Sequence, residues 1–166
     1  MKVQPGRYTA AIEGDFVVFI IGMRINKLWK VHKWLPVARA MGPMVRELMT
    51  HPDKGLLGVS NSITGRTVTM IQYWRSFDQL EQFARNQDDP HLAAWRAFNQ
   101  RVGTNGDVGI YHETFKVQAD QYECVYANMP VVGLAKAGEH VSVGRRGDTA
   151  RDRLDASAVA EAVSNG

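Results

Sequence analysis

The spacing of hydrophobic and polar residues changes along the chain, and each change marks a predicted element. Residues 15–25 are almost continuously β-branched or aromatic, which is typical of a strand covered on both faces. In residues 27–50 the apolar side chains recur every three or four positions, which predicts a helix with one apolar face. Residues 56–63 and 67–74 are predicted strands, and Thr64-Gly65-Arg66 between them indicates a hairpin.

Prolines divide the predicted helix of residues 27–50. Pro36 is expected in the first turn of the main piece, where its missing N–H costs little. Gly42-Pro43 predicts a kink or a break inside the apolar pattern. His51-Pro52 is expected to end the helix.

The second half of the chain continues the same alternation of elements. Ser76 is a good N-cap for a helix that begins at Phe77, and a further helix is expected near Pro90, with Asp89 as its cap. Residues 108–117 read as the fourth strand. The order β-α-β-β-α-β predicts an α+β fold of the ferredoxin-like type, with helices on one face of the sheet.

The two ends of the chain carry weaker patterns. Residues 1–14 read as a lead-in, and residues 122–129 as a fifth strand that extends the sheet or crosses to a partner. Residues 131–166 are rich in Ala, Gly and charged side chains. We expect them to form a peripheral or partly disordered arm, with a weak helix near 148–163, beside one domain over 1–130.

Composition narrows the classes of protein. With 166 residues, 45% hydrophobic and 22% charged, the chain is expected to be globular. Its net charge of +3 is too small to indicate a nucleic-acid binder. The single cysteine, Cys124, excludes an intrachain disulfide and fits a reducing compartment. The apolar run of residues 16–25 is too short for a membrane span and lacks the features of a signal peptide, so a cytoplasmic protein is predicted.

His112 and Glu113 are the main candidates for chemistry. Consecutive strand residues point to opposite faces, so at most one of them can enter a given pocket. His112 could act as a general base or ligate haem iron, or it could be a histidine held inside a half-buried sheet. His91 follows Asp88-Asp89-Pro90 at a predicted helix start, where it is either catalytic or a surface residue of a capping turn.

Aromatic side chains could wall a pocket next to these groups, or could simply form the core. A pocket would also need polar groups, and these are available on the same predicted elements. The candidate lining residues are Trp74, Trp95, Phe98, Gln72 and Tyr126.

Residues 24–46 contain six basic side chains and no acid, with Trp29 and Trp34 among them. Three interpretations stay open for this segment. It could meet anionic lipid, it could attract a carboxylated substrate, or it could be a solvated helix face with long lysine side chains.

Five segments in combination resemble a known protein family. They are RINKLWKVHKWLPVARAMGPMVREL, HPDKGLLGVSNSI, TVTMIQYWRSFDQLEQFARNQDDPHLAAWRAFNQ, GIYHETFKV and QYECVYANMPVVGLAKA. Together they resemble the small monooxygenase-like proteins related to an enzyme of the fungal fumagillin pathway, once a domain of unknown function. A more distant similarity is to phenylacetaldoxime dehydratases. The resemblance covers roughly residues 5–136.

The resemblance implies a dimeric α+β barrel, in which two ferredoxin-like units pack sheet to sheet as a homodimer. It also implies a monooxygenase-like oxidoreductase without a cofactor, acting on an apolar or aromatic small molecule of the secondary-metabolite type. The family motifs fall on Trp74, Arg75, His91, Trp95, His112, Glu113, Tyr126 and Asn128.

These positions give the expected site. His112, Glu113 and His91 are its catalytic candidates, and Asn128 joins the lining residues named above. One alternative is a haem b protein similar to aldoxime dehydratases, with His112 on the iron and no other metal. The other is a non-catalytic module that binds a small ligand or a membrane surface.

Overall fold

The computed structural model describes residues 1–85 and 105–155. Its larger part follows the predicted order. It consists of β2 (Phe16–Ile25), α1 (Val31–Thr50), the short helix η1 (Pro52–Lys54), β3 (Leu56–Thr64), β4 (Thr67–Trp74), α2 (Phe77–Arg85) and β5 (Val108–Val117). The smaller part consists of β1 (Arg7–Ala11), β6 (Tyr126–Ala127), α4 (Leu134–Ala137), β7 (Glu139–Ser142) and η2 (Val143–Arg145).

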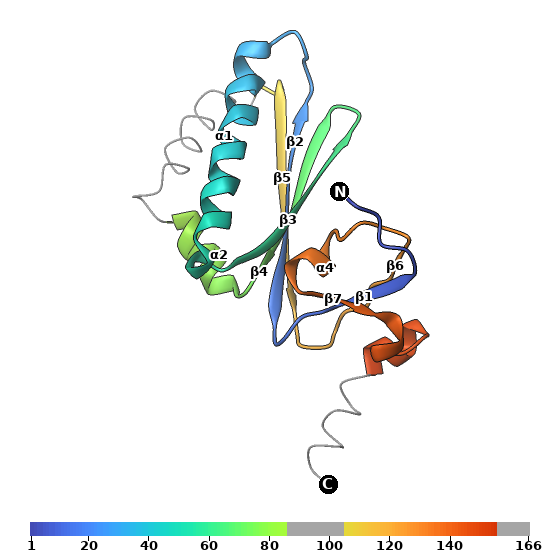
Figure 1. Ribbon diagram of the computed structural model, residues 1–166. Helices are drawn as coiled ribbons and strands as arrows, with labels where there is room; N and C mark the ends of the chain where they lie inside the picture. Colours follow the sequence, from blue (N-terminus) through green and yellow to red (C-terminus); the bar gives the residue numbers. More distant parts are fainter. Residues whose placement is uncertain (86–104, 156–166) are drawn as a thin grey trace.

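Four strands form one antiparallel sheet in the order β3-β4-β2-β5. The first strand of the unit, β2, therefore lies in the middle, between the third and the fourth, as in the ferredoxin-like arrangement. Helices α1 and α2 lie on one face of this sheet (Figure 1). The predicted α+β, ferredoxin-like fold is confirmed.

Burial along β4 alternates with the period of two that a strand has. Met70, Gln72 and Trp74 are buried, whereas the residues between them are only half-buried. Trp74 lies in a core cluster with Leu48 of α1 and Leu80 of α2, so this series of β4 residues faces the helices. This buried layer is formed by every second residue of the strand and by one face of each helix.

Helix α1 is continuous from Val31 to Thr50, so Pro36 does not stand in a first turn and Gly42-Pro43 does not break the helix. Each proline removes one backbone hydrogen bond. Packing against the sheet outweighs that loss, because Leu48 on the apolar face is fully buried. The helix ends at Thr50, as the His51-Pro52 pair predicts.

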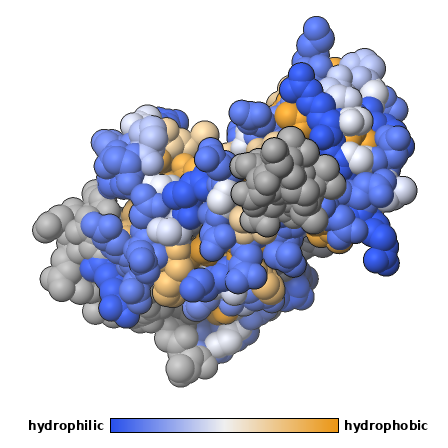
Figure 2. Space-filling model, turned by 90° about the horizontal axis from the view of Figure 1, so that it is seen from below, coloured by the Kyte–Doolittle hydropathy of each residue, from blue (hydrophilic) through white to orange (hydrophobic). Residues whose placement is uncertain are grey.

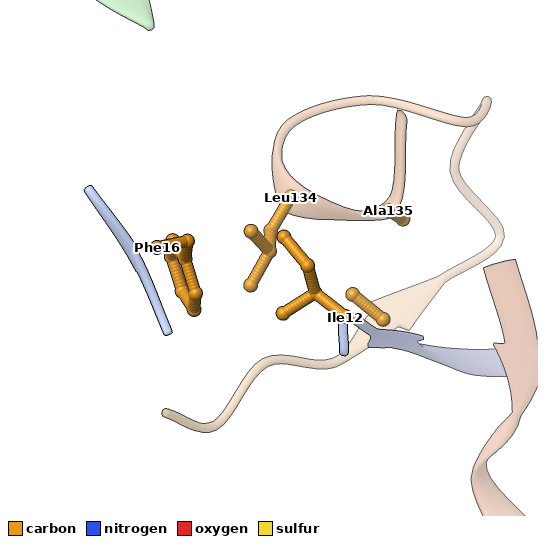
Figure 3. Packing of buried hydrophobic residues seen from close by; sticks show 5 residues of the cluster. Ile12, Phe16, Leu134 and Ala135 are labelled. Atoms are coloured by element: carbon orange, nitrogen blue, oxygen red, sulfur yellow. The ribbon is translucent and has the colours of Figure 1, made fainter. Parts of the chain in front are cut away.

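The chain ends form a second sheet in the order β6-β1-β7, which the sequence pattern did not predict. The expected lead-in contains β1, and the expected fifth strand shortens to Tyr126–Ala127, which pairs with β1 instead of extending the larger sheet. These pairings join residues more than a hundred positions apart, where local spacing carries no signal. Figure 3 shows Ile12, Phe16, Leu134 and Ala135 packed together in the cluster between the two sheets.

The described part of the C-terminal arm is packed rather than peripheral. Leu134, Ala135 and Val143 are buried, and β7 pairs with β1. The start of the predicted late helix is present over residues 150–155, and the rest of it lies outside the described residues. Thr149 and Asp152 close its first turn by exchanging hydrogen bonds between side chains and backbone N–H groups, as in a capping box. The division into a domain and an arm stays a prediction.

Seen from below, the surface is mainly hydrophilic, with hydrophobic side chains in separate areas between the charged ones (Figure 2). Across residues 1–85 and 105–155, no helix has the length and apolar character that a membrane crossing requires.

Candidate active site

A chain of hydrogen bonds runs along the helix-covered side of β4. The indole Nε1 of Trp74 donates to Oε1 of Gln72 at 2.9 Å, and Nε2 of Gln72 donates to Sδ of Met70 at 3.0 Å. Trp74 is fully buried and Gln72 is 3% exposed. Both polar groups of the buried amide are thus satisfied, which stabilises one orientation of the indole ring. Gln72 is therefore a residue that holds Trp74 in place.

His112 lies on the same face of the sheet, on the outer strand β5. It pairs with Ile21 of β2, and its ring lies 5.8 Å from the ring of Phe19, centroid to centroid. Phe19 in turn pairs with Gln72 across β2 and β4. His112 is exposed, and in the described part of the chain no hydrogen bond to its imidazole is present. The face therefore changes from a closed core at Trp74 to an accessible imidazole at His112.

Glu113 lies on the opposite face, as strand alternation predicts. Its neighbour on that face, Tyr111, lies across Gly22 of β2 and shares a hydrogen bond of 2.9 Å with the hydroxyl of Thr69. A Cβ atom at position 22 would collide with the Tyr111 ring, so only glycine permits this close approach. His112 and Glu113 thus cannot act together in one pocket of a single chain.

Tyr126 and Asn128 belong to the small sheet and not to the face that carries His112. The side-chain oxygen of Asn128 accepts a hydrogen bond from the backbone N–H of Gly6, and the backbone N–H of Asn128 donates one to the Gly6 carbonyl. These two bonds fix the chain next to β1. The Tyr126 hydroxyl accepts a hydrogen bond from Ala135 N–H. Burial, with a contribution from the nearby Cys124, raises the pKa of Tyr126 to about 12.

Cys124 and Tyr73 complete this second polar cluster. The Cys124 sulfur accepts a hydrogen bond from Ala10 N–H at 3.3 Å, and its carbonyl accepts one from the Thr9 hydroxyl at 2.7 Å. Burial raises the pKa of the Tyr73 phenol as well, and Cys124 adds to the effect. The cluster is held by several hydrogen bonds, which suits the junction between the two sheets.

Three predicted site residues, His91, Trp95 and Phe98, lie outside the described residues. Their proposed roles stay predictions.

An open pocket of about 430 Å³ lies away from His112, where the small sheet meets the end of β4. Its lining includes Arg75 and Arg146, whose guanidinium groups already bind backbone carbonyls, and Arg146 also pairs with Asp120 at 3.0 Å. A pocket for an apolar molecule needs mainly apolar walls. The charged lining therefore does not favour it as the site of an aromatic substrate.

Sequence reasoning missed two neighbours of the candidate site, Phe19 and Met70. Met70 could have been found from the strand period, because it falls on the same face of β4 as Gln72, whereas Phe19 is placed on that face only by the pairing of β2 with β4. The pairing of β2 with β4 and β5 was the information that the sequence lacked.

Comparison with known proteins identifies the family of the chain. The sequence profile of the monooxygenase af470-like family matches residues 16–134. The chain belongs to this family. Within it, monooxygenase af470 of Aspergillus fumigatus is 30% identical over 146 residues, which cover 82% of this chain and 50% of the relative. The chain thus spans about half the length of that curated relative. The family and the relative are both named after a monooxygenase.

Among solved structures, the chain is similar to aldoxime dehydratase, with a TM-score of 0.53 and 16% identity. The similarity covers 93% of this chain and 46% of the dehydratase. At this identity the likeness shows the fold alone.

Proposed function

We propose that the protein is a monooxygenase-like oxidoreductase that oxidises an apolar or aromatic small molecule beside His112. The observation that carries the proposal is the position of an accessible imidazole next to Phe19, on the helix-covered face of the sheet. Family membership supports the reaction class. A substrate ring there could lie against Phe19 while one of its C–H or O–H groups approaches the imidazole.

The reaction that fits these residues needs a substrate with an acidic C–H group. His112 accepts that proton as a general base, and the resulting carbanion, spread over the aromatic system, reduces O₂. A CH₂ group then becomes a carbonyl that contains one oxygen atom, and the other oxygen leaves as water with both hydrogens. The substrate supplies all four electrons, so no external reductant is needed.

Trp74 and Gln72 are assigned a supporting role in this proposal. The hydrogen-bonded indole closes the inner end of the face, so water is excluded from that side of the substrate. Glu113 lies on the opposite face and takes no part in the step within this chain.

The described surroundings of His112 do not fit haem. A ligating histidine ordinarily donates its second ring nitrogen to a carboxylate or a carbonyl, which orients the ring. Within residues 1–85 and 105–155, His112 has the Phe19 ring as a neighbour and no such hydrogen-bond partner. The described residues do not define a haem site.

The proposal includes a homodimer that is formed through the face opposite the helices. On that face, beyond the small sheet, Phe115 is 51% exposed and Tyr111 is 40% exposed. Ile20 and Ile71, which pair in the centre of the sheet, are only half-buried. A second copy that packs on this face would remove an apolar surface from water.

The experiment compares wild-type protein with His112→Ala in an oxygen electrode. The probes are phenolic tricycles of the anthrone type, in which a CH₂ group between aromatic rings gives a stabilised carbanion. We expect kcat to fall by about 100-fold or more, the usual contribution of a general base. Light scattering should show the same oligomer for both proteins.

Thr114→Ala is the matched control, because Thr114 lies on the same face of the same strand and is also exposed. It should retain wild-type turnover. Equal rates for His112→Ala and wild type would contradict the role of His112. Absence of oxygen uptake by the wild type with every carbanion-forming probe would contradict the reaction class.

A further inference from the structure

Three lysines converge on one buried carboxylate at the start of α1. Lys27, Lys30 and Lys33 place their ammonium nitrogens 2.8, 2.7 and 2.9 Å from the carboxylate oxygens of Asp107. The Asp107 side chain is fully buried, and the three lysine partners hold its pKa well below the usual range of an aspartate. The carboxylate offsets one positive charge, so the group carries two in excess.

The surroundings add positive charge. Arg66 donates a hydrogen bond to the Asn26 carbonyl, and Arg24 donates one to the Thr67 hydroxyl at the neighbouring strand end. No acidic residue occurs between Arg24 and Arg46 in the sequence. The first turn of α1 contains no acid, and its N-cap makes no side-chain hydrogen bond. A helix start with these properties favours negative charge nearby.

The same loop presents apolar side chains to solvent. Trp29 is 74% exposed, and its neighbours Leu28 and Val31 are 46% and 43% exposed. An indole is large enough that it is normally buried for most of its surface. Its exposure here, directly beside the lysines, is therefore unusual for a surface that meets only water.

Backbone contacts hold this loop in its position. Asn26 and Lys27 donate their N–H groups to the Asp107 carbonyl at 3.1 and 3.2 Å, and the Asn26 side chain donates to Gly106. The Trp34 indole donates to the Leu28 carbonyl at 3.0 Å. The exposed Trp29 thus sits on an ordered support, at the end of α1 that is remote from α2 (Figure 1).

We propose that residues 26–33, the Trp29 tip, dock on a bilayer that contains anionic phospholipid. The ammonium groups would face the lipid phosphates while the indole and the flanking Leu28 and Val31 enter the headgroup region. Tryptophan suits this depth, because its ring is apolar and its N–H is polar. Lysine stems can lie along the apolar layer while their charges stay in water. The role of Asp107 is to hold three ammonium groups together at the base of the tip.

Charge complementarity selects the bilayer over an apolar partner protein, because each basic residue near an anionic surface adds to the attraction. The proposal does not depend on the reaction at His112. Docking would bring the enzyme to a surface in which apolar small molecules dissolve.

The test is flotation of the full chain with phosphatidylcholine vesicles, with and without phosphatidylserine. Wild-type protein should float with the phosphatidylserine vesicles at low salt and dissociate in about 1 M NaCl, where the Debye length falls to about 3 Å. Trp29→Ala should lower the vesicle partition coefficient by about tenfold. Lys30→Gln should lower it about fivefold, since two lysines still pair with Asp107.

Phe77→Ala is the matched control, because Phe77 is an aromatic residue of α2 that is 39% exposed. This variant should bind vesicles like the wild type. Absence of wild-type binding to phosphatidylserine vesicles would overturn the proposal, and so would unchanged binding by Trp29→Ala. Salt-sensitive binding to an oligonucleotide without vesicle binding would assign the lysines to nucleic acid instead. A change in oligomeric state on Trp29→Ala would make the tip a subunit contact.

Discussion

The two faces of the four-stranded sheet differ although the same strands build both. Tyr73 and Trp74 are neighbours in β4, yet Trp74 is locked under the helices and Tyr73 packs against the cluster that joins the small sheet. The helix-covered face closes around a satisfied hydrogen-bond chain at Trp74 and is accessible at His112. The opposite face is covered at one end by the small sheet and α4, where Gly58 lets Ala137 approach closely, and exposes aromatic rings beyond them. One face is completed within the chain, and the other has room for a partner.

Trp74→Ala should give the largest effect, because it empties the closed part of the helix-covered face. We expect a loss of about 3–5 kcal/mol in the free energy of unfolding from the cavity and the lost apolar contacts. The Gln72 amide also loses its donor. Urea unfolding followed by circular dichroism measures the change.

The matched control is Trp29→Ala, which removes the same side chain from an exposed position and should change stability by less than about 0.5 kcal/mol. Similar losses for the two variants would mean that the described packing around Trp74 is wrong.

Phe115→Glu tests whether the opposite face is completed by a second copy. Replacing an exposed aromatic ring of the proposed interface by a carboxylate should raise the dimer dissociation constant by about 100-fold, which is about 2.7 kcal/mol. Sedimentation velocity over a range of concentrations measures the shift. Ile63→Glu changes a residue that is 77% exposed on the helix-facing side of β3, so that variant should stay dimeric. A wild-type protein that is monomeric at micromolar concentration would end the proposal.

The smallest effect concerns Tyr126 at the junction of the two sheets. Its folded pKa of about 12 exceeds the ordinary value of 10.0, so the folded state retains the phenol proton when the unfolded state has lost it. Tyr126 therefore stabilises the fold fully below pH 10, and this contribution is lost as the pH rises toward 12. Tyr126→Phe should flatten that part of the stability profile, measured as urea midpoints between these pH values.

Most of the larger sheet could be predicted from local patterns. The strands Phe16–Ile25, Thr67–Trp74 and Val108–Val117 lie where the runs of apolar residues indicated, and Ser76 caps α2 through a hydrogen bond to Gln79 N–H. These features depend on residues within a few positions of each other. The separation of His112 from Glu113 follows from the same local geometry.

The candidate site could be predicted only in part. Trp74 and His112 share a face, but Tyr126 lies in the small sheet and Asn128 directly follows it, although the family motifs include all four. A motif gives the order of residues along the chain and not the sheet to which each segment is added. The alternation of side chains along β5 also does not indicate which face of the strand the helices cover.

The sequence by itself determined the period of each strand and helix, because side-chain direction follows from backbone geometry over a few residues. Only the tertiary structure decided which distant segments meet. It paired β1 with β6 and β7, and it placed Asp107 among lysines some eighty positions earlier in the chain. Such contacts depend on the closure of long loops and on the burial of particular groups, and neither leaves a periodic trace in the sequence. They formed the small sheet and gathered the charges of the Trp29 tip.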